Sequence, residues 1–88
     1  MSEPREHTLK RLQMRSMRRG IKEMDLILSA YAAARLAQMD DATLGLYDLL
    51  LNENDHDLYQ WVTGQVAPPD RFAAMIADVQ ALYAAQPG

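Results

Sequence analysis

Residues 15–25 read RSMRRGIKEMD, with three arginines before a single glycine and a lysine and two acids soon after it. Basic residues at the end of one helix and acidic residues at the start of the next both interact favourably with the helix dipoles. Gly20 suits the position just past a helix end, where a left-handed backbone is common. The stretch therefore predicts a turn between two helices, the first ending near Arg18 and the second beginning near Lys22.

Helical periodicity continues on both sides of this turn, and no segment alternates apolar and polar residues as a half-buried strand would. Asp40 is a good N-cap residue, Gly64 suits a helix end, and Asp70 follows two chain-breaking prolines. The sequence predicts an all-α protein, a compact five-helix bundle that forms a single domain over residues 1–88, with frayed ends at about 1–4 and 86–88. Helices are expected at about residues 4–18, 22–38, 40–51, 55–63 and from 70 to near the C-terminus.

Apolar residues spaced three or four apart indicate which face of each helix is buried. Leu58 and Trp61 lie one turn apart on the fourth helix, so both are expected in the core. On the fifth helix the apolar spacing runs through Val79 to Tyr83. The first helix has only a thin apolar stripe, to which Met17 could belong.

Composition excludes several classes of protein. The chain has no cysteine, which excludes disulfide bonds and thiolate chemistry. No apolar run approaches the roughly 18 residues that a membrane span requires, and the N-terminus lacks the apolar core of a secretory signal. We therefore expect a soluble, cytoplasmic bacterial protein that is not inserted in a membrane. Nothing in the sequence specifies an oligomer, so a monomer is expected.

The net charge of −3 is unevenly distributed along the chain. Residues 1–22 hold seven of the nine Lys and Arg residues but only two of the twelve Asp and Glu residues. On a continuous helix Arg11, Arg15, Arg18 and Arg19 would share one face, which is more positive charge than a helix dipole requires. Two interpretations stay open: a solvated basic face, or a docking surface for an anionic partner.

Candidate catalytic and metal-binding groups are few. Asp55, His56 and Asp57 are consecutive and would point in different directions, so Asp55 is interpreted as a helix cap and Asp57 as a first-turn residue. Glu23 and Asp25 are two residues apart, which makes a poor acid–base pair on a helix. No phosphate-binding glycine loop and no nucleophile motif is present. We expect no catalytic residue, no metal site and no stably bound cofactor.

Two motifs resemble those of the SdhE family, small bacterial proteins that promote covalent flavin attachment to succinate dehydrogenase and that have mitochondrial relatives. The first motif, R-G-x-x-E, is met by Arg19, Gly20 and Glu23. The second, D-L-[FY]-x-W after an Asp-rich turn, is met within DHDLYQW at residues 55–61. The resemblance covers about residues 9–76 in order and spacing.

The resemblance implies a five-helix assembly factor, not an enzyme, that binds the flavoprotein subunit of succinate dehydrogenase or, in some bacteria, that of fumarate reductase. FAD would be attached to this client, which would form the bond itself, and whether this chain contacts FAD stays open. The surplus arginines are expected to pair with Glu23 across the turn. The residues that would bind the partner are Arg15, Arg18, Arg19, Gly20, Glu23, Asp25 and Tyr59, and those with a structural role are Asp57, Leu58 and Trp61.

Two other hypotheses compete with this one. The basic first helix could bind nucleic acid as part of a small regulatory domain, but the isoelectric point near 5.2 and the lack of a recognition helix argue against it. A scaffold or antitoxin-like protein without any link to flavin is the third hypothesis. Nucleic acid is therefore not expected among the partners.

Overall fold

The computed structural model describes residues 3–85, which form five α-helices and one short 3-10 turn, with no strand among them. The all-α, five-helix prediction is confirmed. Of the ends that were expected to fray, residues 1–2 and 86–88 lie outside the described residues, whereas Glu3 and Pro4 are hydrogen-bonded to the first helix. The elements are α1 (Arg5–Arg15), α2 (Lys22–Arg35), η1 (Leu36–Gln38), α3 (Asp41–Leu50), α4 (Asp55–Val62) and α5 (Asp70–Ala85).

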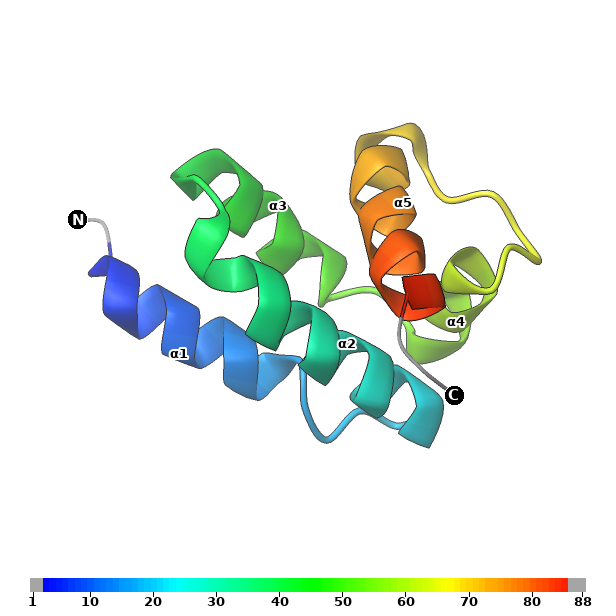
Figure 1. The fold of residues 1–88 in the computed structure, drawn as a ribbon, viewed down its shortest axis with the longest axis horizontal. Helices are drawn as coiled ribbons and strands as arrows, with labels where there is room; N and C mark the ends of the chain where they lie inside the picture. Colours follow the sequence, from blue (N-terminus) through cyan, green and yellow to red (C-terminus); the bar gives the residue numbers. More distant parts are fainter. Residues whose placement is uncertain (1–2, 86–88) are drawn as a thin grey trace.

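The helix α2 lies at the centre of the fold, where it packs against α1, α4 and α5. Figure 1 shows α1 and α2 side by side along the long axis, with α3 next to them and α4 and α5 together at the other end. The described chain measures 39 × 28 × 23 Å along its principal axes. The turn between α1 and α2 contacts the loop between α3 and α4, although the two segments are far apart in the sequence.

The core is made by the apolar faces that the sequence indicates, with two exceptions. Leu58 and Trp61 are buried as predicted, and the Trp61 ring lies 6.1 Å from that of Phe72. Tyr83 is 47% exposed, so its predicted burial is wrong; Leu82 is the residue that packs on the core at that end of α5. Met17 is exposed because it lies in the turn beyond the end of α1.

The start of α3 and the end of α4 follow local sequence signals, whereas the start of α4 does not. Asp40 caps α3 by accepting a hydrogen bond from Thr43 N at 2.8 Å, as predicted. Gly64 follows the end of α4 with a left-handed φ of 81°, also as predicted. The expected cap role of Asp55 is wrong. Asn54 caps α4 instead, since its side chain accepts from His56 N at 2.8 Å and leaves the Asp55 carboxylate free for other contacts.

No helix among the described residues is long and apolar enough to cross a membrane.

Candidate functional site

The helix α1 ends at Arg15, three residues before the predicted end, because Ser16 turns into the core. The Ser16 hydroxyl donates to the Leu12 carbonyl at 2.8 Å and lies 2.6 Å from the Tyr47 hydroxyl. Since Ser16 has one proton to donate, the Tyr47 hydroxyl must be the donor in their shared bond. Burial raises the pKa of Tyr47 to about 12, because the charged phenolate would lose its hydration. This buried pair sets the point at which the chain leaves α1.

The left-handed residue of the turn is Arg18, not Gly20. Arg18 has a φ of 57°, and Gly20 is not among the residues with positive φ, so the predicted helix-ending role of Gly20 is wrong. A left-handed backbone costs a non-glycine residue roughly 1–2 kcal/mol. The turn therefore keeps a strained arginine at an exposed position.

Arg19 points into the molecule and is almost fully hydrogen-bonded there. Its Nε lies 2.7 Å from Asp55 Oδ1, and its Nη1 donates to the Leu51 carbonyl at 3.1 Å. Its Nη2 donates to the Glu53 carbonyl at 3.3 Å. Only 11% of the side chain stays exposed, which leaves little surface for the predicted contact with a partner.

Gly20 is favoured by a close approach and not by its own backbone angles. Gly20 N donates to Asp55 Oδ2 at 2.6 Å. A Cβ at this position would lie 3.0 Å from the same oxygen, which is closer than an ordinary van der Waals contact. A larger residue would require the Asp55 carboxylate to shift by a few tenths of an ångström.

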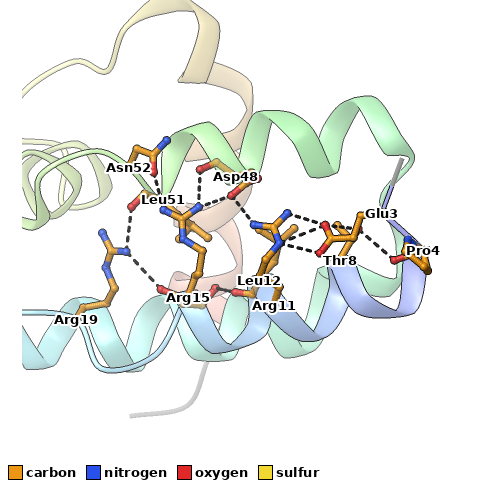
Figure 2. A network of polar contacts seen from close by, with 11 residues as sticks. Glu3, Pro4, Thr8, Arg11, Leu12, Arg15, Arg19, Asp48, Leu51 and Asn52 are labelled. Atoms are coloured by element: carbon orange, nitrogen blue, oxygen red, sulfur yellow. Dashed lines mark hydrogen bonds and ion pairs between the residues drawn. The ribbon is translucent and has the colours of Figure 1, made fainter. Parts of the chain in front are cut away.

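Arg11 and Arg15 extend from α1 to α3, where both contact the Asp48 carboxylate (Figure 2). Arg11 also reaches Glu3 at 3.0 Å, and Arg15 donates to Asn52 Oδ1 at 2.6 Å. The hydrogen bond from Arg11 is the main reason that the pKa of Asp48 lies below its ordinary value of 3.8. The basic face that the sequence suggested does not repel itself, because the chain supplies its own anions. The nucleic-acid hypothesis loses its main support for the same reason.

The outer edge of the turn, which we define as Arg18, Lys22 and Glu23, is different. All three residues are exposed, and within residues 3–85 none of their side chains takes part in a hydrogen bond or an ion pair. The expected pairing of the arginines with Glu23 is therefore wrong. Two cations and one carboxylate therefore lie within six residues of one another, exposed and without a polar side-chain contact in the described part of the chain.

The contacts that the sequence did not reveal join residues that are 31–37 positions apart. Asp48, Ser16 and Asp55 carry no local signal of their partners, because capping and periodicity concern residues only a few positions apart. In the sequence, only the two motifs and their fixed separation indicated that the turn and the start of α4 are related.

Comparison with known proteins agrees with that sign. A family profile named Sdh5 and described as "Flavinator of succinate dehydrogenase" matches residues 10–83, a range that includes both motifs. The chain belongs to this family. The predicted family resemblance is confirmed.

Two curated fungal proteins illustrate the degree of similarity. The protein named succinate dehydrogenase assembly factor 2, mitochondrial, of Saccharomyces cerevisiae is 44% identical over 75 residues, 82% of this chain and 46% of its own length. Its counterpart in Meyerozyma guilliermondii is 45% identical over 73 residues, 80% of this chain and 54% of its own length. The chain thus spans about half the length of these curated relatives. Their names describe them as mitochondrial, so these relatives do not support the bacterial and cytoplasmic assignment expected from the sequence.

Three further residues that the family resemblance singled out, Asp25, Tyr59 and Asp57, differ in their surroundings. Asp25 is half-buried and accepts from the Ser29 hydroxyl at 3.2 Å, and Tyr59 is half-buried against the core. Asp57 is exposed in the first turn of α4, where its charge favours the helix dipole. In the described part of the chain, no group of three or more His, Asp or Glu residues is placed to hold a metal ion.

Proposed function

We propose that this chain is a succinate dehydrogenase assembly factor that binds the flavoprotein subunit and promotes covalent attachment of FAD to it. The observation that carries the proposal is the family match over residues 10–83, whose description reads "Flavinator of succinate dehydrogenase". The fungal relatives are named as assembly factors of the same enzyme.

The proposed mechanism is that of a chaperone and needs no reacting group from this chain. The flavoprotein forms its own bond to FAD, and the assembly factor stabilises the arrangement in which the flavin and the acceptor side chain meet. Holding two groups in a reactive geometry is sufficient to accelerate a bond-forming step substantially. The chain itself binds no cofactor stably in this proposal.

The proposed contact surface is the outer edge of the turn together with the exposed Gly20. Arg18 supports this choice, because strain at an exposed, unpartnered residue is a common feature of binding sites. Arg15 and Arg19 contribute indirectly, by holding the turn in place. Asp25 and Tyr59 are included in the contact surface on the family resemblance alone. The charges of the outer edge would meet complementary charges on the client.

The partner is proposed to be the succinate dehydrogenase flavoprotein, with that of fumarate reductase as a second client where it exists, and the assembly factor acts as a monomer. It works in whichever compartment the client receives its FAD.

A gene deletion tests the proposal directly. In the deletion strain, the covalent flavin fluorescence of the succinate dehydrogenase flavoprotein on a denaturing gel should fall, and the wild-type chain should restore it. Unchanged fluorescence in the deletion strain would overturn the proposal.

Complementation with Glu23→Ala then tests the surface. We expect this variant to fail while its helicity by circular dichroism is unchanged. Glu6→Ala is the matched control, because Glu6 is an exposed acid in the first turn of α1 as Glu23 is in that of α2. Equal complementation by the two variants would remove Glu23 from the contact surface.

A further inference from the structure

Both oxygens of the Asp55 carboxylate are used on the turn between α1 and α2. Oδ1 lies 2.7 Å from Arg19 Nε, and Oδ2 accepts the Gly20 N–H at 2.6 Å. The two partners are 36 and 35 residues away from Asp55 in the sequence. We infer that Asp55 is a positioning residue, a latch that holds the turn so that Arg18 and Glu23 stand ready for the client. The inference rests on the function proposed above and adds a residue that makes no client contact itself.

The main chain of the turn has few other hydrogen bonds. Within the described residues, the backbone hydrogen bonds of the turn end with Met17 N to the Met14 carbonyl and resume where Asp25 N meets the Ile21 carbonyl. Between them, Gly20 N to Asp55 is the one hydrogen bond from the main chain of the described turn to the rest of the molecule. Without it, the strained backbone at Arg18 would be restrained only through neighbouring side chains, such as the contacts of Arg19 with the Leu51 and Glu53 carbonyls.

The residue that forms the latch lies on a well-packed helix. Asp55 is the first residue of α4, and that helix is fixed by the buried side chains of Leu58, Trp61 and Val62. A functional group is held most accurately when its supporting residue lies on a packed helix and its own side chain is restrained by hydrogen bonds. Asp55 meets both conditions, since only 20% of its side chain is exposed.

The latch also gives a physical reason for the two motifs to occur together. Arg19 and Gly20 come from the first motif, and Asp55 begins the segment that contains the second. One carboxylate joins them, and the absence of a side chain at Gly20 allows the joint, because a Cβ would lie 3.0 Å from Oδ2. The motifs are two halves of one structure that presents the outer edge of the turn.

The first part of the test uses the free chain of residues 1–88. We expect the Gly20 amide to be protected from hydrogen exchange in the wild type and to exchange at least about tenfold faster in Asp55→Ala, since a lost hydrogen bond exposes the amide to water. Asp55→Asn keeps an acceptor for Gly20 N and should be intermediate. An unprotected Gly20 amide in the wild-type chain would overturn the latch.

The second part measures affinity for the isolated succinate dehydrogenase flavoprotein at a temperature where all variants are folded. Asp55→Ala should bind about tenfold more weakly if the α1–α2 turn has its binding conformation in about one variant molecule in ten. Asp48→Ala is the matched control, because it also removes a carboxylate that two groups contact, here Arg11 and Arg15 of α1, away from the outer edge. It should stay within about threefold of the wild type. Equal losses for the two variants would overturn a specific positioning role.

A double-variant cycle distinguishes positioning from general structural support. If Asp55 acts through the outer edge, Asp55→Ala should cost less affinity in a Glu23→Ala background than in the wild type, because the surface it positions is already impaired. Fully additive losses would overturn the inference. A wild-type chain that does not bind the flavoprotein would instead refute the proposed function, while loss of Gly20 protection in Asp55→Ala would still establish the latch.

Discussion

The inner edge of the α1–α2 turn, formed by Ser16, Arg19 and Gly20, faces the rest of the molecule, and each residue has a hydrogen-bond partner on α3, α4 or the loop between them. The outer edge, only one to three residues away, is exposed and has no such partner among the described residues. Arg18 and Arg19 are neighbours of the same type with opposite surroundings. Residue type and spacing therefore do not tell which arginine stabilises the fold and which is available to a partner.

The difference separates two kinds of effect that a mutation in this stretch can have. Substitutions on the inner edge should lower the free energy of unfolding, and substitutions on the outer edge should change binding with little effect on stability. Each of the following measurements would break or sharpen that division, beginning with the largest expected effect.

Arg19→Ala should destabilise the protein by about 3 kcal/mol. It leaves the largely buried Asp55 carboxylate without its charged partner and frees the Leu51 and Glu53 carbonyls. Urea unfolding followed by circular dichroism gives the difference. Arg18→Ala is the control and should stay within about 0.5 kcal/mol of the wild type; similar losses for both variants would abolish the distinction between the edges.

Ser16→Ala should cost about 1–2 kcal/mol, because the buried Tyr47 hydroxyl loses its acceptor. The double variant Ser16→Ala, Tyr47→Phe should recover much of this loss, since removing both polar groups leaves nothing unsatisfied. Thermal or urea unfolding of the three variants provides the cycle. A double variant that is less stable than Ser16→Ala would mean that packing, not the hydrogen bond, matters at this position.

Arg18→Gly should stabilise the protein by about 0.5–1 kcal/mol, because glycine adopts the left-handed backbone without strain while the unfolded chain gains some entropy. Arg18→Ala removes the same charge but keeps the strain, so it should give no such gain. Under the proposed function, both variants should bind the client less well. A destabilised Arg18→Gly variant would show that the arginine side chain supports the fold.

Acidification should give the smallest effect, through the carboxylate network behind the inner edge. The pKa of Asp48 is lowered in the folded state, mainly by its hydrogen bond from Arg11. Its contribution is therefore fully present above its ordinary value of 3.8 and is lost as the pH falls below that value. Glu3 shifts in the same direction through Arg11, so Asp48→Asn should reduce the loss of stability in acid without abolishing it. Urea midpoints between about pH 2 and 6 test this, and an unchanged pH dependence in Asp48→Asn would exclude Asp48 as a source of it.

Much of the fold was predictable from residues a few positions apart. The cap at Asp40, the end of α4 at Gly64 and the burial of Trp61 follow from local hydrogen bonding, backbone preference and helical period. The end of α1 was misplaced by three residues because Ser16 is drawn inward by Tyr47, a partner that lies 31 positions away. Tyr83 was misplaced because the apolar spacing does not say where the helix leaves the core.

The sequence by itself determined the helices, their order and the family, since these depend on local chemistry and on motifs that can be read in one dimension. Only the tertiary structure decided the roles of the charges in RSMRRGIKEMD. It turned Arg19 toward Asp55 and three carbonyl oxygens, put the left-handed backbone at Arg18, and left Glu23 exposed. The reason is physical: a charged side chain goes where acceptors replace the water it loses on burial, and those acceptors are brought together only by the folded chain.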